Sequence, residues 1–270
     1  MWIDTHCHLN APEFSGTLPA IIAAAKEKNV RAILLPAVRA ADFQNVKVLS
    51  SQYHDDIPGL VYTLGIHPLY TNQAHEQDIQ ILDEQIRQSL ADPRFVGIGE
   101  IGLDYFVEGL DPHKQDYFFQ AQLDLAQQYQ LPVILHVRRS RDAILKALRR
   151  RNIAGGIAHA FNGSFQQAEQ FIDLGFKLGF GGAATYERAL QIRRLLTEFS
   201  LESIVTETDS PDIPPAWLKQ EGILCNEPAF IARIANALAA IRGVGEEEFA
   251  STVWQNAMKV LPRWATACAL

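Results

Sequence analysis

The chain has 270 residues, of which 48% are hydrophobic, and its 31 acidic and 24 basic residues give a formal net charge of −7. This composition predicts a globular protein with a large core, and the acidic balance argues against a protein that wraps duplex DNA with a basic surface. No apolar run reaches the roughly 18 residues that a membrane helix needs, and the N-terminus lacks the pattern of a signal peptide. We therefore expect a soluble, cytoplasmic protein without membrane contact. Its three cysteines, Cys7, Cys225 and Cys268, are expected to be reduced.

Apolar, strand-like runs alternate with helical patterns along the chain. Strands are predicted at 1–3, 32–35, 60–66, 95–99, 132–135, 156–159, 176–180 and 203–208, and helices at 18–28, from 42, and at 76–89, 113–128, 140–151, 165–174 and 187–197. Eight strands joined through helices predict parallel pairing and closure into a barrel. Two more helices, 227–241 and 246–261, are expected to pack outside it. The sequence predicts an α/β fold, a TIM (β/α)8 barrel with extra C-terminal helices, as a single domain over 1–270.

Local signals for the ends of helices support this frame. Ser140, Ser164 and Asp42 each stand before a helical pattern and are predicted as N-caps. Gly175 follows the helix predicted at 165–174 and is expected to end it.

Histidines and carboxylates stand where the predicted strands end. They are His6 and His8, His67, Glu100, His136, His159, and the pair Glu207 and Asp209. The C-terminal ends of barrel strands converge on one mouth, where such barrels build their active sites. Imidazoles and carboxylates gathered there predict a metal site.

The first strand leads into Asp4-Thr5-His6-Cys7-His8. Side chains alternate along an extended segment, so His6 and His8 share a face and can bind one ion. Asp4 is expected to orient a ligand histidine rather than to bind metal itself. We expect Cys7 to be a small buried side chain.

Glu100 ends a glycine-rich apolar run in which Gly97, Gly99 and Gly102 are expected to leave space beside the carboxylate. A carboxylate has two oxygens and can bridge two ions. His136 and His159 end the next two strands, and we expect them to hold a second ion together with Glu100. Asp104, beyond the turn, is expected to be a solvated loop residue, with a place on the substrate side or behind the ligands as the alternative.

The last strand ends in Glu207-Thr-Asp209. Asp209 is predicted to coordinate the first ion at the mouth and to accept a proton from an attacking water, although spacing alone does not decide which carboxylate is the general base. Glu207 is expected to orient His6 and His8. Arg138 follows the fifth strand and is a candidate phosphate contact.

Motifs along nearly the full length resemble those of the TatD family of metal-dependent deoxyribonucleases, within the amidohydrolase superfamily. They are Asp4-x-His6-x-His8, Gly65-Ile-His67-Pro68, Gly99-Glu100-Ile-Gly-Leu-Asp104-Tyr105, Leu131-Pro-Val-Ile-Leu-His136, His159-x-Phe161-x-Gly163, Gly179-Phe-Gly-Gly182 and Glu207-Thr-Asp209-Ser-Pro211.

The resemblance implies a set of ligands and a function. One divalent ion would be held by His6, His8, Glu100 and Asp209, and a second by Glu100, His136 and His159; zinc, manganese, magnesium and iron all suit such ligands. Catalytic roles would fall to Asp209, Glu100 and His67, with His67 beside the substrate phosphate or the reacting water. The implied activity is metal-dependent hydrolysis of phosphodiester bonds through metal-bound hydroxide, trimming ends of single-stranded DNA in the manner of a 3′–5′ exonuclease. A small phosphoester is the other expected substrate, and we expect no obligate protein partner.

Two departures from the family pattern bear on the substrate. Cys225 precedes Asn226 where the family usually has arginine, so a cation that would read phosphate is expected to be missing there. His159-Ala-Phe-Asn-Gly replaces the usual His-Cys-Phe-Ser/Thr-Gly. Two alternatives therefore stay open: an amidohydrolase-type enzyme cleaving an amide, lactone or small phosphoester, and a metal-binding protein without activity.

Overall fold

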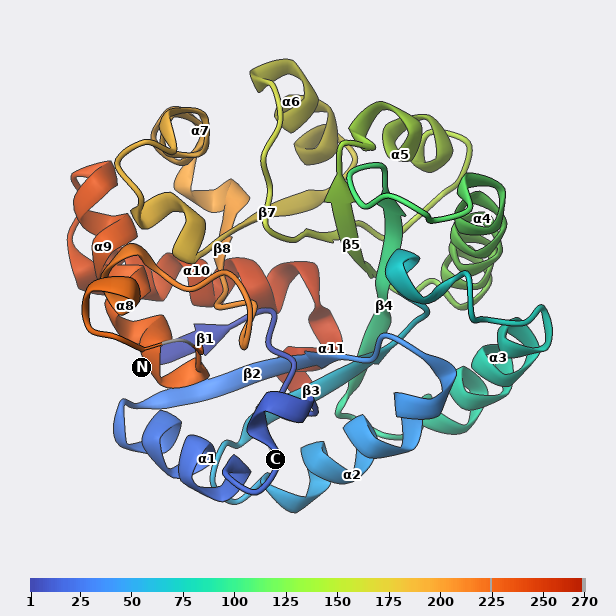
Figure 1. Ribbon diagram of the computed structural model, residues 1–270, viewed down its shortest axis with the longest axis horizontal. Coiled ribbons are helices and arrows are strands. Elements are labelled where there is room, and N and C mark those ends of the chain that lie inside the picture. Colours follow the sequence, from blue (N-terminus) through green and yellow to red (C-terminus); the bar gives the residue numbers. More distant parts are fainter. Residues whose placement is uncertain (224, 269–270) are drawn as a thin grey trace.

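Eight parallel strands form one sheet in which spatial order follows sequence order. They are β1 (Trp2–Asp4), β2 (Val30–Pro36), β3 (Gly59–Leu64), β4 (Phe95–Asp104), β5 (Val133–Arg138), β6 (Gly156–Ala158), β7 (Phe176–Phe180) and β8 (Ile204–Thr206). The computed structural model describes residues 1–223 and 225–268; residues 224, 269 and 270 of the predicted domain range lie outside it. Figure 1 shows the strands arranged around a centre with helices outside them.

The sheet curls until its last strand meets its first. The Thr5 amide donates to the Thr206 carbonyl oxygen at 2.9 Å, and Cys7 forms a parallel bridge with Ser210. These contacts join the segments just beyond β1 and β8. The contacts confirm the predicted TIM barrel. They also bring the segments that follow the first and the last strand side by side at its mouth.

Seven helices follow β1 to β7 in turn: α1 (Leu18–Glu27), α2 (Phe43–Gln52), α3 (Gln77–Ser89), α4 (Pro112–Tyr129), α5 (Arg141–Leu148), α6 (Phe165–Asp173) and α7 (Leu190–Glu198). The short α8 (Ala216–Gln220) and then α9 (Ile231–Arg242), α10 (Glu246–Val260) and α11 (Pro262–Ala267) come after β8. Among the described residues, we find no helix with the length and apolar character required to span a membrane.

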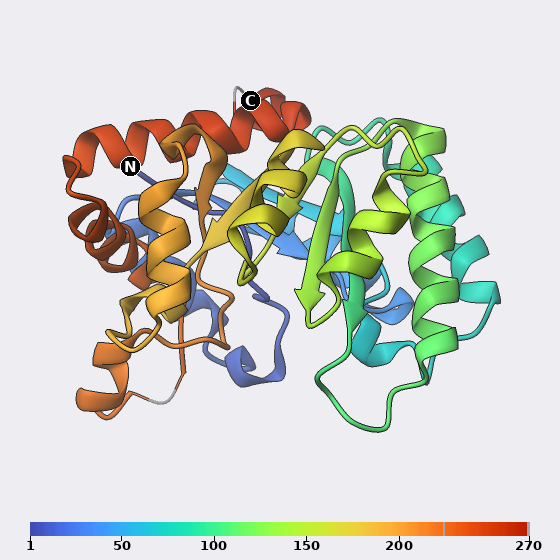
Figure 2. The ribbon, with the colours of Figure 1, turned by 90° about the horizontal axis from the view of Figure 1, so that it is seen from above.

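Of the two C-terminal helices predicted to pack outside the barrel, one does so and the other covers an end of it. Only α9 joins the outer ring, where it contacts α7. Helix α10 contacts β1, β7 and β8, and the Trp264 indole of α11 donates to the Gly59 carbonyl at the start of β3. Figure 2 shows α10 and α11 lying across the end of the barrel opposite the strand arrowheads. These two helices close the bottom of the barrel, because the apolar side chains at the starts of the strands must be buried against another element.

All three predicted residues stand at N-cap positions, but only one of them caps its helix with its side chain. Ser164 forms a capping box with Gln167, and Gly175 follows α6 with a φ of +84°, a conformation that suits glycine. Ser140 and Asp42 stand at N-cap positions but bond elsewhere, Ser140 to the Leu103 carbonyl and Asp42 to the Arg39 guanidinium. The Ser140 bond fastens the start of α5 to the end of β4, beside the mouth.

Strand β4 is longer than the predicted 95–99, and its glycines have another role than expected. Pairing with β5 continues as far as Asp104, opposite Arg138, so Glu100 lies inside the strand rather than at its end. A Cβ on Gly102 would lie 2.0 Å from the His136 carbonyl oxygen. Glycine therefore allows β5 to approach β4 closely, and this close approach brings His136 to Glu100.

Candidate metal centre

The predicted histidines and carboxylates meet at the C-terminal end of the barrel. They extend from β1 (His6, His8), β3 (His67), β4 (Glu100), β5 (His136), β6 (His159) and β8 (Glu207, Asp209). Most of them are buried, whereas His8, His136 and Asp209 are partly exposed and mark the side that faces the mouth.

Glu100 lies at the middle of the cluster, and its Oε2 atom faces one group of side chains. His6 Nε2 lies 3.1 Å from Oε2 and His8 Nε2 lies 3.6 Å from it. Asp209 Oδ1 completes the group, 3.6 Å from His6 Nε2 and 3.5 Å from His8 Nε2. These four side chains are the set that the sequence assigned to a first ion.

The other carboxylate oxygen of Glu100 faces a second group. Oε1 lies 2.9 Å from His159 Nε2, 3.0 Å from His136 Nδ1 and 3.2 Å from His67 Nε2. Clusters of possible ligand atoms within 4.8 Å of one another include His67 with Glu100 and His136. One carboxylate thus presents a separate oxygen to each of two groups of imidazoles.

The partners of His67 argue that it is a donor rather than a ligand. Its Nδ1 accepts a hydrogen bond from the Leu69 amide at 3.1 Å. Burial lowers the pKa of His67 to about 4, so the ring is neutral near pH 7. A neutral imidazole whose Nδ1 accepts carries its proton on Nε2, which therefore donates to Glu100.

His136 has the opposite arrangement. Its Nε2 lies 2.9 Å from Asp104 Oδ2, and a carboxylate accepts, so Nε2 carries the proton. In the neutral ring Nδ1 then directs a lone pair at Glu100 Oε1. A second proton, on Nδ1, satisfies this contact when no metal is bound; burial lowers the pKa of His136, but the two carboxylates outweigh burial and raise it accordingly. A metal ion would take the place of that proton, and a carboxylate that binds the far nitrogen of a ligand histidine is a common feature of metal sites.

The arrangement of His6 and His8 also fits the binding of a divalent metal. His6 Nε2 lies 3.2 Å from His8 Nε2 while both nitrogens face carboxylate oxygens. A neutral imidazole has only one proton, and the buried His6 Nδ1 has no hydrogen-bond partner among the described residues. Neutral imidazoles and carboxylates are the ligands that zinc, manganese and iron accept. Clusters close enough to hold an ion include His6 with His8 and Glu100, and His6 with His159 and Asp209. The division into two ions that the resemblance implies stays a prediction.

The carboxylates are ionised and ready to bind cations. Burial by itself would raise the pKa of Glu100, but the facing His67, His159 and His6 lower it well below its usual value. Burial also raises the pKa of Asp209, but His159 and His8 lower it by more, so it lies below its usual value. Both groups therefore carry negative charge at neutral pH.

Comparison with known proteins agrees with this geometry. The family model described as "TatD related DNase" matches residues 3–262. A metal-dependent hydrolase of Haemophilus influenzae is 36% identical over 96% of this chain and 98% of its own length. The crystal structure of YjjV, the TatD homologue of Escherichia coli K12, has a TM-score of 0.89 at 35% identity, covering 97% of this chain and 98% of that one. A human protein named deoxyribonuclease TATDN3 is 29% identical over 97% of this chain and 94% of its own length.

The chain belongs to the TatD family. It is a metal-dependent hydrolase with the TIM-barrel fold of that family, and its histidines, Glu100 and Asp209 include groups that could bind metal.

Of the two supporting carboxylates of this TatD protein, one stands elsewhere than expected and the other acts on the expected histidine through the backbone. Glu207 Oε1 accepts from the Ala160 amide at 2.5 Å and lies 3.6 Å from His159 Nδ1, so it stands behind His159 rather than His6 and His8. It fits there because Gly179 has no side chain; a Cβ would lie 2.2 Å from Glu207 Oε2. Asp4 accepts from the backbone amides of His6 and Thr208 instead of touching an imidazole ring. It therefore orients the His6 segment through the backbone.

Asp104 is the residue that sequence reasoning placed wrongly. It is buried, not a solvated loop residue, and its Oδ2 binds His136. Its Oδ1 accepts from the amides of Phe106 and Val107 at 2.8 and 2.9 Å. Burial raises its pKa, but these bonds outweigh burial and bring the pKa to about 2. Strand alternation offered a signal, since residues 100 and 104 share a face of one strand.

We expect Asp104→Asn to weaken metal binding by roughly 10- to 100-fold, the usual cost of losing a residue that orients a ligand histidine. The Asn oxygen can keep the two amide bonds, so the loop after β4 should hold its place. Calorimetric titration of the protein with Mn²⁺ measures this affinity. An unchanged affinity would show that Asp104 does not support His136 as a ligand.

Metal binding should release protons near neutral pH. Burial lowers the pKa values of His8, His136 and His159, but facing carboxylates outweigh burial and raise them above 6.5. An ion must displace these protons, so the apparent affinity should rise as pH increases from about 6 to 8. Calorimetric titration in two buffers with different heats of ionisation counts the released protons. Affinity that stays flat over this range would contradict the ligand assignment.

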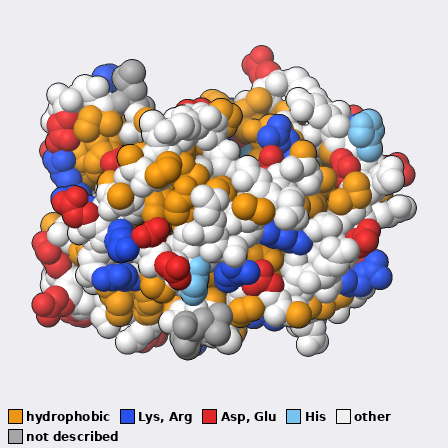
Figure 3. Space-filling view, turned by 90° about the horizontal axis from the view of Figure 1, so that it is seen from below, with side chains coloured by type: hydrophobic (Ala, Val, Ile, Leu, Met, Phe, Trp, Pro, Cys, Tyr) orange, Lys and Arg blue, Asp and Glu red, His pale blue; other side chains and the backbone are white. Residues whose placement is uncertain are grey.

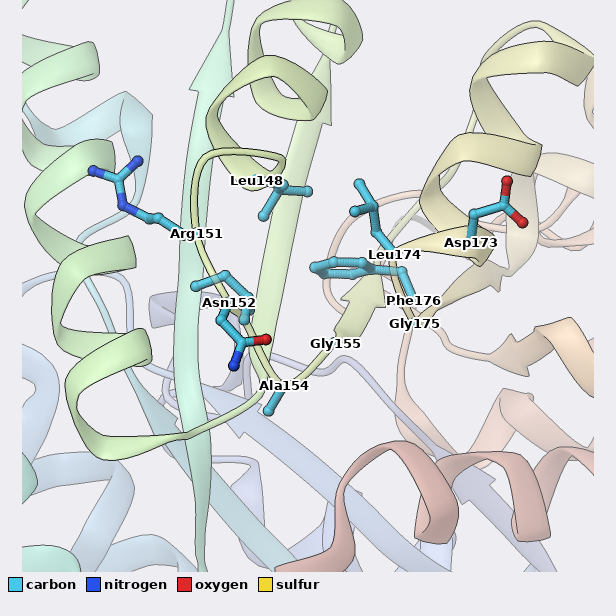
Figure 4. A pocket seen from close by; sticks show the side chains of 10 residues that line it. Leu148, Arg151, Asn152, Ala154, Gly155, Asp173, Leu174, Gly175 and Phe176 are labelled. Atoms are coloured by element: carbon cyan, nitrogen blue, oxygen red, sulfur yellow. The ribbon is translucent and has the colours of Figure 1, made fainter.

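A separate cavity of about 510 Å³ lies at the opposite end of the barrel, beside the starts of β6 and β7. Figure 4 shows the apolar side chains of Leu148, Leu174 and Phe176 there, with Arg151 extending away from them. The Arg151 guanidinium is already paired with Asp124 and Gln120 of α4. This cavity offers no reactive group comparable to the centre at the mouth.

Proposed function

We propose that the protein is a phosphodiesterase that uses two divalent ions to shorten single-stranded DNA from an end, in the manner of a 3′–5′ exonuclease. The observation that carries this proposal is the position of Glu100, whose two oxygens face two separate groups of possible ligands. Two ions held by such groups would stabilise the attacking and the leaving oxygen in the hydrolysis of a phosphate ester.

Different residues around that centre would bind the ions, accept a proton and donate a hydrogen bond. When bound by these residues, divalent ions would neutralise charge on a phosphate and lower the pKa of a water molecule towards about 7. Asp209 accepts the proton of the attacking water, since its carboxylate is ionised and partly exposed at the mouth. His67 donates through Nε2, either to Glu100 or to a phosphate oxygen that takes the place of this contact.

The choice of DNA rests on the family and on Arg138. The family model and the human relative both carry deoxyribonuclease in their names. Arg138 ends β5 at the mouth with its side chain 49% exposed, and its Nη1 lies 3.9 Å from Asp104 Oδ2. On the face shown in Figure 3, basic side chains are interspersed with acidic ones, which does not suit binding along a duplex. Contact limited to the mouth suits the end of one strand.

One observation favours a smaller substrate as a second candidate. Cys225 stands where an arginine is usual in the family, and the carboxylates of Glu13, Glu227 and Asp212 lie close enough to add to burial in raising its pKa. This side of the mouth is acidic and would repel a long phosphate chain. An amide, lactone or small phosphoester would not extend into it.

The test uses end-labelled single-stranded DNA and a panel of small phosphodiesters, amides and lactones, each with Mg²⁺, Mn²⁺ or Zn²⁺ and with a chelator as control. We expect stepwise shortening of DNA that the chelator abolishes. Labels at the 5′ and the 3′ end report the direction. Turnover of a small compound without any shortening of DNA would replace the proposal with the second candidate.

A further inference from the structure

An exposed aromatic side chain lies beside the centre with two guanidinium groups against it. Phe106, in the loop between β4 and α4, is 46% exposed. Arg138 Cζ lies 3.9 Å from the centroid of its ring, and Arg139 Cζ lies 4.6 Å from it. Unpaired bases of single-stranded nucleic acids stack on such aromatic rings and on the planes of guanidinium groups.

The backbone at the end of β5 brings both arginines to the same ring. Consecutive side chains of an extended strand point to opposite faces, so two neighbouring arginines would normally diverge. Arg139 has a φ of +57°, in the left-handed region that few residues other than glycine adopt. This turn ends the alternation, and both guanidinium groups reach Phe106.

Phe106 is also tied to the metal centre through one carboxylate. Asp104 Oδ1 accepts from the Phe106 amide, while Asp104 Oδ2 binds His136. The backbone at Phe106 is therefore held to the carboxylate that also binds His136. A phosphate at the centre would have its neighbouring base within the reach of this loop.

The distribution of charge around the mouth favours the side of β4 and β5 for binding a DNA strand. Asp212, beyond β8, lies near Glu13 of the segment between β1 and α1, and burial, Asp209 and Glu13 together raise the pKa of Asp212. That side repels phosphates, whereas the side of β4 and β5 carries Arg138 and Arg139.

We propose that Phe106, Arg138 and Arg139 form a stacking surface for a nucleobase of the DNA strand whose end is at the metal centre. This inference rests on the proposed function and adds to it a site that reads the base rather than the phosphate. It makes the protein selective for strands that carry bases over bare phosphodiesters of the same charge.

The test compares two strands of about eight nucleotides, a length within the range such surfaces bind. One strand carries bases and the other carries abasic residues, and both have phosphorothioate linkages to slow hydrolysis. Fluorescence anisotropy with Mn²⁺-loaded protein, and again with chelator, gives the affinities. We expect the strand with bases to bind about 5- to 150-fold more tightly, as stacking of one base predicts. Phe106→Ala should lose most of this preference.

Tyr105→Ala is the matched control. Tyr105 has the same 46% exposure, but burial and the Asp116 carboxylate of α4 raise its pKa, which places its hydroxyl towards α4. This variant should keep the preference for bases. Equal binding of both strands by the unchanged protein, or a preference that survives Phe106→Ala, would overturn the stacking surface. Hydrolysis of DNA without a preference for bases would overturn the stacking surface but leave the proposed function intact. Base-dependent binding without hydrolysis of unmodified DNA would overturn the proposed function but leave the stacking surface intact.

Discussion

Glu100→Gln should remove metal binding and hydrolysis together. Glu100 faces five histidines, and its two oxygens serve both groups of possible ligands. The amide has the same shape but no charge, and its NH2 group would point hydrogens at one of the two groups. The loss of activity should exceed the roughly 10- to 100-fold expected for a residue that only supports a ligand.

The measurement combines metal content, from mass spectrometry of the purified protein, with turnover of labelled DNA. Glu207→Gln serves as a matched control, because Glu207 is an equally buried carboxylate that lies behind His159. It should retain both ions with reduced affinity. Full metal content in Glu100→Gln would show that this carboxylate does not bridge two ions.

Asp209→Asn should separate turnover from metal binding. We expect kcat to fall by roughly 10²- to 10⁴-fold, the usual contribution of a general base. Asparagine can still present an oxygen to the His6 and His8 group, so at saturating Mn²⁺ the protein should hold its ions. The φ of +56° at Asp209 also suits asparagine, which tolerates the left-handed region.

The pH profile of kcat provides a second measure of the same role. In the unchanged protein the pKa of Asp209 lies below its usual 3.8, so the base is ionised throughout the neutral range and its loss should lower kcat uniformly there. If the metal-saturated Asp209→Asn variant kept normal turnover, another group, such as Glu100, would have to accept the proton.

The sequence predicted the barrel because its signals are local and repeated. Apolar runs separated by helical patterns recur with the lengths of a βα unit, and only parallel pairing accommodates them. The same repetition placed His6, His8 and His159 correctly beyond strand ends, whereas His136 lies inside β5, which continues past the predicted 135 to Arg138. The short α8 and α11 escaped prediction, since five or six residues carry too little periodicity to be recognised.

The roles of supporting groups were harder to predict than the ligands. Asp104 looked like a loop residue because the pairing of β4 with β5 extends beyond the glycines, and that extension depends on how closely two strands approach. Glu207 turned out to stand behind His159 because Gly179, on the neighbouring strand, leaves room for it. Neither effect is visible in a single stretch of sequence.

The sequence alone determined the type of fold, the family and the residues that gather at the mouth, since each depends on residue type and spacing along the chain. Only the tertiary structure decided which oxygen of Glu100 faces which histidines, which nitrogen of His67 and of His136 carries the proton, and that Phe106 lies against two arginines. These features depend on distances of about 3 to 5 Å between side chains from different strands. The closure of the barrel sets those distances, and no local pattern encodes them.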